Sequence, residues 1–248
     1  VDNKPKIQNT VRHLYLYKAL FNITTVIFTN SSAVKKYCKK YEVHTLPVVE
    51  TNKYGLPKIK HLLIKARESY PANQYMYINS DILINPFIFR IAELLDGFFD
   101  PNSTVGFVVP LSCSTYSHQV CITTIYSHYR LFIIDELFTL IWIHCREQEG
   151  DCQIDLFVFS RFYPFEQLAE VVVGRCYVDS AIMLCSHRNS LPVVDLTNVR
   201  SFHQGIASSG DLITGIERSN YYYNRPLMGV FNRSEIALFS SHIVTNVL

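Results

Sequence analysis

The chain has 248 residues, which is enough for one large domain or two small ones with a full hydrophobic core. Its apolar content of 48% suits a globular α/β protein and argues against an intrinsically disordered chain. Because 23 basic residues nearly balance 21 acidic residues, the net charge of +2 gives no support for electrostatic binding to nucleic acid or to a membrane surface.

The sequence contains few features that indicate a cellular location or a structural metal site. Seven cysteines occur without a Cys-x-x-Cys pair, which argues against a structural zinc site. The most apolar run, Leu131–Ile143, contains Asp135 and Glu136 and is too short to span a bilayer, so we expect a core helix there. Four Asn-x-Ser/Thr sequons permit a location in the secretory-pathway lumen but do not establish it, and a cytoplasmic location stays open. These sequons begin at Asn22, Asn30, Asn102 and Asn232.

The first half of the chain alternates helix-like and strand-like runs. Apolar residues recur at helical spacing over Val11–Phe21, including Val11, Leu14, Tyr15 and Leu20. The further helices expected here are Ala33–Tyr41, which is basic, Lys58–Ser69 and Phe87–Phe99. The expected strands are Ile23–Phe28, Val43–Val49, Met76–Asn79 and Val105–Pro110. This alternation predicts a mostly parallel, Rossmann-like sheet.

The pattern loosens after Leu111. We expect a polar loop at Ser112–His118 and a core helix at about 130–148. Strands are expected at Ile154–Phe159 and Pro192–Leu196, with a helix at Ala181–His187 between them.

The stretch Tyr75–Asn85 changes polarity abruptly. A short buried strand is followed by Asn79, Ser80 and Asp81, and then by an apolar run that leads to a helix start at Asn85-Pro86. A carboxylate at the end of a buried strand is costly unless something uses it, and ligands of open α/β sheets bind at this end of the strands. The alternative is that Asp81 only caps the turn.

The segment Asn79-Ser80-Asp81-Ile82 resembles the DxD segment of nucleotide-sugar glycosyltransferases of the GT-A fold. Four further stretches match the same branch in the right order: Tyr54–Pro57, Asp155–Arg161, Val173–Arg175 with Asp179, and Val194-Asp195 leading to His203-Gln204. The resemblance covers nearly the whole chain and implies a single GT-A-like domain over residues 1–248, with helices flanking the sheet. Such proteins usually begin with a strand that contacts the nucleotide base. We expect this chain to start just after that strand and so to be a fragment that lacks it.

The resemblance implies a metal-dependent glycosyltransferase that uses a nucleotide-diphosphate sugar, expected to be a uridine diphosphate sugar, and an unknown acceptor. A divalent ion, Mn²⁺ or Mg²⁺, would neutralise the leaving diphosphate. Asp81 is the expected carboxylate ligand, and His203 resembles the late histidine that returns to the metal. Position alone favours a surface or satisfied loop histidine for His203, and it is the resemblance of Val194-Asp195 and His203-Gln204 that points to the metal.

The same resemblance assigns donor contacts. Asn79 and Ser80 are expected to bind the donor beside Asp81, with the Asn79 amide directed at the ribose or a metal-bound water. The Gly174-Arg175 loop would face the donor sugar, because glycine allows close backbone approach and arginine is a planar donor for phosphate. The alternative for this loop is a surface turn with a solvated Arg175.

Two carboxylates are candidates for catalysis. By the resemblance Asp179 lies beside the reacting sugar, where it could act as general base or orient the donor. Asp155 opens a strand under the same site and is the second candidate. The alternatives are that Asp179 caps its helix or pairs with Arg175, and that Asp155 bonds to backbone or to Arg161.

The alternative interpretation is a binding or scaffold domain that has the same fold but has lost catalytic turnover. Asp179 is followed by Ser180-Ala181 rather than a polar-aromatic pair, and the segment after Gln204 lacks a further histidine and tyrosine. An unrelated nucleotide-binding α/β protein fits less well, because the sequence has neither a Gly-x-Gly-x-x-Gly segment nor a Walker loop.

Overall fold

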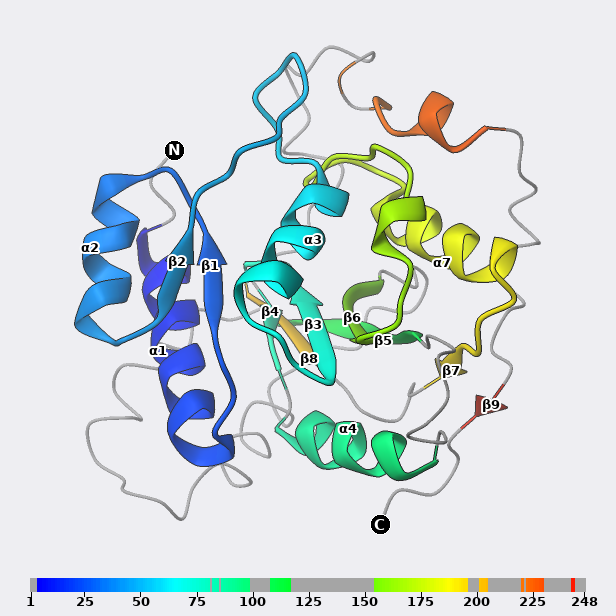
Figure 1. The fold of residues 1–248 in the computed structure, drawn as a ribbon. Helices are drawn as coiled ribbons and strands as arrows, with labels where there is room; N and C mark the ends of the chain where they lie inside the picture. The colour runs from blue at the N-terminus through cyan, green and yellow to red at the C-terminus, as the bar shows by residue number, and fades with distance from the viewer. Residues whose placement is uncertain are drawn as a thin grey trace.

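The computed structural model describes residues 4–80, 82–84, 86–98, 108–116, 154–195, 201–204, 220, 222–229 and 242–243 (Figure 1). The core helix expected at about 130–148 lies outside these ranges. In the parts of the chain that they cover, no helix is long and apolar enough to cross a membrane.

The N-terminal elements form a small unit at one side of the molecule (Figure 1). They are helix α1 (Lys4–Phe21), strand β1 (Val26–Phe28), helix α2 (Ser32–Lys40) and strand β2 (His44–Leu46). β1 and β2 pair in parallel as a two-stranded sheet. The hydroxyl of Ser31 caps α2 by accepting a hydrogen bond from the N–H of Val34. Val11, Cys38 and Val43 form the small core between these elements.

Helix α1 buries only part of the face that its apolar residues predict, with Val11 in the core as expected. Tyr15 and Leu20 are exposed, at 40% and 39% of their surface. Thr10, His13 and Tyr17 are buried instead, at helical spacing. The reason is that this face contacts the turn after strand β3, where its polar groups find hydrogen-bond partners.

The largest sheet has five strands in the order β3-β6-β5-β8-β4. They are β3 (Gln74–Ile78), β4 (Ile82–Leu83), β5 (Val108–Tyr116), β6 (Ile154–Ser160) and β8 (Ser201–Gln204). Only the β5–β8 pair is parallel, and the other three neighbouring pairs are antiparallel. The expected mostly parallel sheet is therefore not observed. Strand β6 enters between β3 and β5 and runs against both, a direction that local periodicity does not specify.

Strand β5 belongs to both halves of this sheet. Its first part pairs with β6, and Cys113–Tyr116 pair with β8 after a register shift at Leu111/Ser112. The polar loop expected from Ser112 is thus replaced by strand, because β8 returns from far along the chain to pair with it. Strand β3 pairs with β6, whereas β4 pairs with β8. The short connection between β3 and β4 therefore joins the two edge strands of the sheet.

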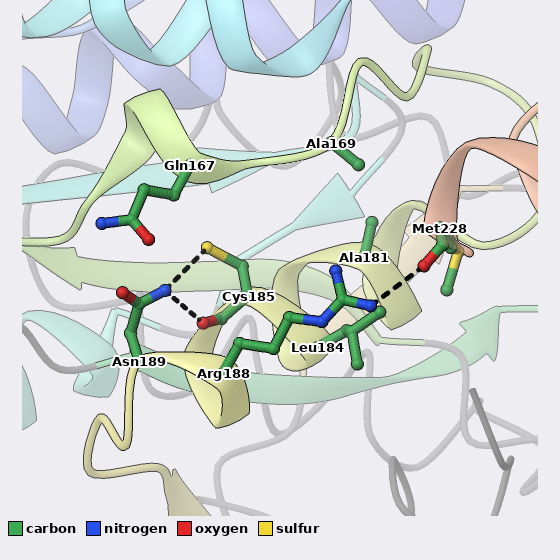
Figure 2. Close-up of a pocket in the computed structure, with 8 residues that line it drawn as sticks. All are labelled: Gln167, Ala169, Ala181, Leu184, Cys185, Arg188, Asn189 and Met228. Atoms are coloured by element: carbon green, nitrogen blue, oxygen red, sulfur yellow. Dashed lines mark hydrogen bonds between the residues drawn. The ribbon is translucent and has the colours of Figure 1, made fainter. Parts of the chain in front are cut away.

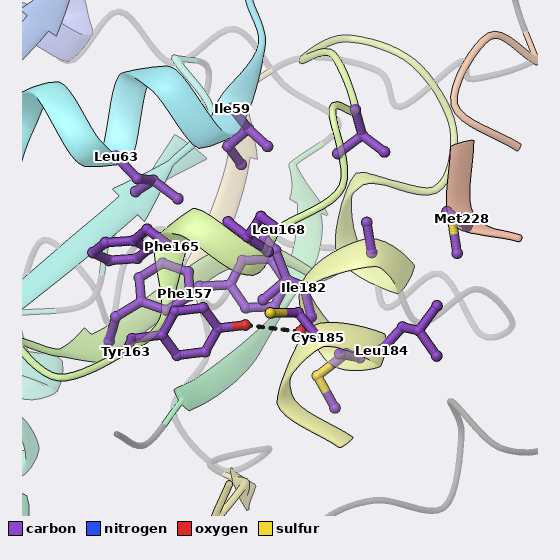
Figure 3. Packing of buried hydrophobic residues seen from close by; sticks show 14 of the residues in the cluster. Ile59, Leu63, Phe157, Tyr163, Phe165, Leu168, Ile182, Leu184, Cys185 and Met228 are labelled. Carbon is purple, nitrogen blue, oxygen red and sulfur yellow. Dashed lines mark hydrogen bonds between the residues drawn. The ribbon is translucent and has the colours of Figure 1, made fainter. Parts of the chain in front are cut away.

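Helices cover both faces of β6. Phe157 and Phe159 point into a core formed with α3 (Ile59–Ser69), the short helix η1 (Phe165–Gln167) and α7 (Val178–Arg188) (Figure 3). Leu156 and Val158 point to the opposite face, towards α1 and α4 (Phe87–Phe98). This alternation of neighbouring side chains gives a layered, mixed α/β fold.

The remaining elements are short. Strand β7 (Val194–Asp195) pairs in parallel with β9 (His242–Ile243), and η3 (Arg225–Met228) is a 3₁₀ turn. The predicted helices corresponding to α2, α3, α4 and α7 are confirmed within a few residues at each end.

Candidate functional site

The turn after β3 carries the DxD-like residues. The side-chain oxygen of Asn79 accepts a hydrogen bond of 2.6 Å from the hydroxyl of Tyr77, and its carbonyl accepts one of 3.1 Å from the N–H of Ile82. Asn79 is half-buried and Ser80 is exposed. Asp81 lies outside the described residues. Both described donor-binding candidates thus sit on an accessible turn at the end of a strand.

Helix α1 supports this turn with three buried polar side chains. The hydroxyl of Thr10 lies 2.5 Å from the carbonyl oxygen of Ser80 and donates to it. The hydroxyl of Tyr17 donates to the carbonyl of Ile84 and also contacts His13 Nε2. Burial lowers the pKa of His13 to about 4, so its ring is neutral at physiological pH. These buried hydrogen bonds fix the path of the chain around the motif.

The predicted partner segments reach this turn through the sheet. In the antiparallel β4–β8 pair, His203 stands opposite Ile82, the residue that follows Asp81 in the chain. In the β3–β6 pair, Leu156 stands opposite Ile78, so the start of β6, where Asp155 lies, is at the same end of β3 as the motif. The side chains of Asp155 and His203 lie outside the described ones.

The loop at Gly174 lies beside another of the resembling stretches. Lys58 and Val172 form an antiparallel bridge, and the N–H of Val173 donates to the carbonyl of Pro57 at 2.9 Å. The turn that ends at Pro57 is therefore held against the loop. Gly174 has φ of +76°, a conformation that favours glycine, and a Cβ built there would meet open space.

Ion pairs reinforce this junction at the start of α3. The carboxylate of Glu170 lies 3.2 Å from Lys58 Nζ, 3.3 Å from Lys60 Nζ and 3.1 Å from His61 Nε2. Burial alone would raise the pKa of Glu170, but the hydrogen bonds from these three side chains outweigh it and lower that pKa. Glu170 is thus ionised at neutral pH and ties α3 to the segment that leads to Gly174.

Asn224 anchors the same loop from a distant segment, and sequence analysis missed it. Its side chain is fully buried. Its Oδ1 accepts from the N–H of Val172 at 2.8 Å, and its Nδ2 donates to the carbonyls of Val172 and Cys176 at 2.9 and 3.0 Å. The Asn224 amide thereby makes the hydrogen bonds to the loop backbone that a neighbouring strand would otherwise make. No local pattern around Asn224 indicates this role, because its partners lie about 50 residues earlier.

Described residues hold Arg175 through its Nε and Nη1 groups. Its Nε lies 3.1 Å from the carbonyl oxygen and 3.0 Å from the side-chain oxygen of Asn220, and its Nη1 donates to the carbonyl of Gly174 at 2.6 Å. Its Nη2 bonds to none of the described residues, and no described ion pair joins it to Asp179. The guanidinium is therefore held in place with donors left over.

Asp179 lies in the first turn of α7. Its carboxylate accepts from the N–H of Ser180 at 2.7 Å and from the hydroxyl of Ser180 at 3.4 Å. The residue before the helix, Tyr177, is left-handed with φ of 73° and supplies no side-chain cap. Burial raises the pKa of Asp179, which makes its carboxylate a stronger base than an exposed one.

The candidate residues thus fall into two groups. Strand pairing brings the segments of Asn79, Asp155 and His203 to one end of β3. Hydrogen bonds join Gly174 and Arg175 to the turn at Pro57 and to residues 220–224. No described hydrogen bond or ion pair links the two groups directly.

The described side chains contain no group of three or more His, Cys, Asp or Glu that could hold a metal ion. The expected ligands Asp81 and His203 fall outside that search. A metal site at the motif therefore stays a prediction.

A small cavity of about 60 Å³ lies along α7 and is lined by none of the motif residues (Figure 2). Cys185, Arg188, Asn189 and Met228 contribute to its lining. Asn189 Nδ2 donates to the carbonyl of Cys185 at 2.8 Å, and Arg188 Nη2 donates to the carbonyl of Met228 at 3.2 Å. Ligand sites for small molecules typically exceed about 300 Å³, so this cavity is too small for a nucleotide sugar.

Comparison with known proteins leaves the family open. No protein-family model matches the sequence, and no curated protein matches it. Eleven chains of solved structures match. One is a CMP:2-keto-3-deoxy-manno-octonic acid synthetase described as complexed with CTP, with 11% sequence identity, a TM-score of 0.41, and coverage of 77% of this chain and 79% of that chain. A likeness of this size carries no argument about function.

Proposed function

We propose that this chain is a GT-A-like glycosyltransferase domain that moves a sugar from a nucleotide-diphosphate sugar, expected to be a uridine diphosphate sugar, to an acceptor. One observation carries the proposal. Strand β8 pairs with β4 so that His203 stands opposite Ile82, beside Asp81 in the chain. Two segments that sequence analysis expects at one metal, more than 100 residues apart, are thus neighbours in the sheet.

The expected donor set suits a hard divalent ion. Asp81 would supply a carboxylate and His203 an imidazole, and Mn²⁺ accepts both types of ligand while Mg²⁺ prefers oxygen. When bound, the ion would supply Lewis-acid stabilisation of the leaving diphosphate. Asn79 and Ser80 lie on the same turn, which α1 supports through Thr10, and would contact the donor.

The second loop would bind the donor sugar. Open space next to Gly174 lets a ligand approach the backbone closely. Arg175 is already oriented by Asn220, so its remaining N–H groups can meet an anionic oxygen with little loss of side-chain entropy. These features favour a preorganised anion contact at this loop.

The acceptor hydroxyl needs a base. Asp179 is proposed for this role because its raised pKa favours proton uptake. Asp155 is the second candidate, since β6 begins at the same end of β3 as the motif. If Asp179 takes the proton, the acceptor binds near the loop at Gly174. If Asp155 takes it, the acceptor binds near the end of β3.

A scaffold without turnover is the second candidate function. One observation favours it: each described hydrogen bond of Arg175 and Asp179 is made to neighbouring protein groups. In that case the loop would be a structural element, and the fold would serve only to bind.

The decisive experiment titrates the protein with uridine diphosphate and a panel of its sugars, with and without Mn²⁺, and then measures nucleotide release. We expect metal-dependent binding and turnover in the wild type. Arg175→Ala should retain metal-dependent affinity for uridine diphosphate but lose turnover by about 10²-fold, a typical effect of removing one transition-state donor. Metal-dependent binding without turnover in the wild type would support the scaffold function, and absence of binding would contradict both.

A further inference from the structure

Helix α2 presents a strongly basic face to solvent. Lys35, Lys36, Lys39 and Lys40 are all exposed, while the opposite side of the helix buries Cys38. The helix contains no acidic residue. It lies at the outer edge of the N-terminal unit, beside α1 and away from the five-stranded sheet (Figure 1). The face is therefore available to a partner of opposite charge.

Within the described part of the chain, no carboxylate forms an ion pair with these lysines. Elsewhere Lys18, Lys58, Lys60 and Lys65 each pair with a glutamate, but no described ion pair involves a lysine of α2. Lys40 only lies over the ring of Tyr41, at 5.5 Å from its centre.

Helix stability does not explain the pattern either. Lys39 and Lys40 in the last turn are favoured by the helix dipole, but Lys35 and Lys36 are not. Like charges four residues apart, as in Lys35 with Lys39 and Lys36 with Lys40, destabilise a helix. The helix dipole therefore accounts for only half of the basic face, and Lys35 and Lys36 point to a use outside the folded chain.

Charge is also segregated along the sequence. Residues 1–41 contain eight of the 23 basic residues and one of the 21 acidic residues, so this segment has a formal charge of +7 and the remainder has −5. The small net charge of +2 conceals this separation. A molecule so polarised is drawn to an anionic surface by its N-terminal unit and repelled by the rest, which selects one orientation.

We propose that the basic face of α2 docks the protein on the anionic headgroups of a lipid membrane. Clusters of four to eight lysines or arginines on an amphipathic helix are typical of such binding. Lysine suits a diffuse layer of charge, whereas nucleic-acid recognition favours the fork of arginine, and α2 has none. The rings of Tyr15 and Tyr41, 6.0 Å apart between centres, adjoin this face, and tyrosine is favoured at the boundary between headgroups and acyl chains.

The test measures binding of the whole chain to vesicles of phosphatidylcholine with phosphatidylserine, by cosedimentation. The variant Lys35→Gln/Lys36→Gln/Lys39→Gln/Lys40→Gln removes the basic face, and Lys65→Gln/Arg90→Gln/Arg161→Gln/Arg225→Gln is a control with the same net charge. Each lysine contributes about tenfold or somewhat less, so we expect the α2 variant to bind roughly a hundredfold to a thousandfold more weakly and the control to change little. Binding of the wild type should also fall with added salt and be absent with pure phosphatidylcholine.

Two results would overturn the proposal. One is equal loss in both variants, which would mean that net charge rather than α2 determines binding. The other is no binding of the wild type to the anionic vesicles, including the case in which the protein binds an RNA oligonucleotide or polyglutamate instead. Far-UV circular dichroism of both variants verifies that each retains the wild-type fold. Because nucleotide-sugar turnover is not read in this assay, its outcome is independent of the proposed enzymatic function.

Discussion

The two loops of the candidate site are held in contrasting ways. The motif turn after β3 is held by Thr10, His13 and Tyr17 of α1, which precede it by about 70 residues. The loop at Gly174 is held by the amide of Asn224, which follows it by about 50 residues. One support contains a buried titratable ring, and the other contains none.

This difference predicts how the two loops of the site respond to a fall in pH. Protonation of His13 opposes the packing of α1 against the motif turn, so acid should loosen the motif first. The Asn224 amide does not titrate, and the ion pairs of Glu170 lower the pKa of that carboxyl, so the loop at Gly174 should respond to acid less than the motif turn does. The predictions that follow separate the two supports.

The largest effect is expected for Asn224→Ala. The change removes three hydrogen bonds and leaves backbone groups of Val172 and Cys176 without partners in a buried place, which destabilises the protein by about 3 kcal/mol. Urea unfolding measures the free energy. The matched control is Asn220→Ala, which retains the backbone carbonyl that Arg175 uses and should cost less than about 1 kcal/mol. Equal losses in the two variants would show that Asn224 is not the anchor.

A pH effect of nearly the same size should come from His13. Its pKa is about 4 in the folded protein against 6.5 when unperturbed, so below pH 6.5 the unfolded chain binds a proton that the folded chain excludes. Stability contributed by the neutral ring is complete above pH 6.5 and is lost as the pH falls towards 4, by up to about 3 kcal/mol.

The measurement is the free energy of unfolding of the wild type and His13→Gln across this pH range. The variant should lose the part of the pH dependence that belongs to this ring. Asn224→Ala should shift the whole curve without changing its slope. A wild-type and a His13→Gln curve of the same slope would refute a neutral His13 in the folded state.

A smaller effect distinguishes two buried threonines. Thr10→Val removes the hydroxyl that donates to Ser80 and should destabilise the protein by about 1 kcal/mol. Thr25→Val should be neutral or slightly stabilising, because the buried hydroxyl of Thr25 has no hydrogen-bond partner among the described residues. Thermal melts of the pair compare them directly. If both variants were equally destabilised, the contact between α1 and the motif turn would contribute nothing specific.

Elements with local signals were predictable from the sequence. The spacing of Ile59, Leu62 and Leu63 marks the buried face of α3, and the change from Tyr77 to Asn79 marks the end of β3. Each depends on residues a few positions apart, so periodicity and turn chemistry suffice.

The directions of the strands and the supports of the site were not predictable in this way. Strand β6 runs against β3, although the chain between them permits either direction. On α1, the polar residues His13 and Tyr17 do not register as core positions, because their burial depends on the carbonyl of Ile84 far along the chain. The anchoring role of Asn224 could not be predicted for the same reason. A polar side chain that bonds to backbone far along the chain is not marked by the residues next to it in the sequence.

The central claim is that the DxD-like motif binds a metal with a nucleotide diphosphate, and calorimetry of Asp81→Ala tests it most directly. With Mn²⁺ present, the wild type should bind uridine diphosphate, and Asp81→Ala should lose the metal-dependent part of that affinity. His203→Ala should weaken it less, because the carboxylate carries the charge. Unchanged metal-dependent affinity in Asp81→Ala would contradict the metal site and, with it, the proposed glycosyl transfer.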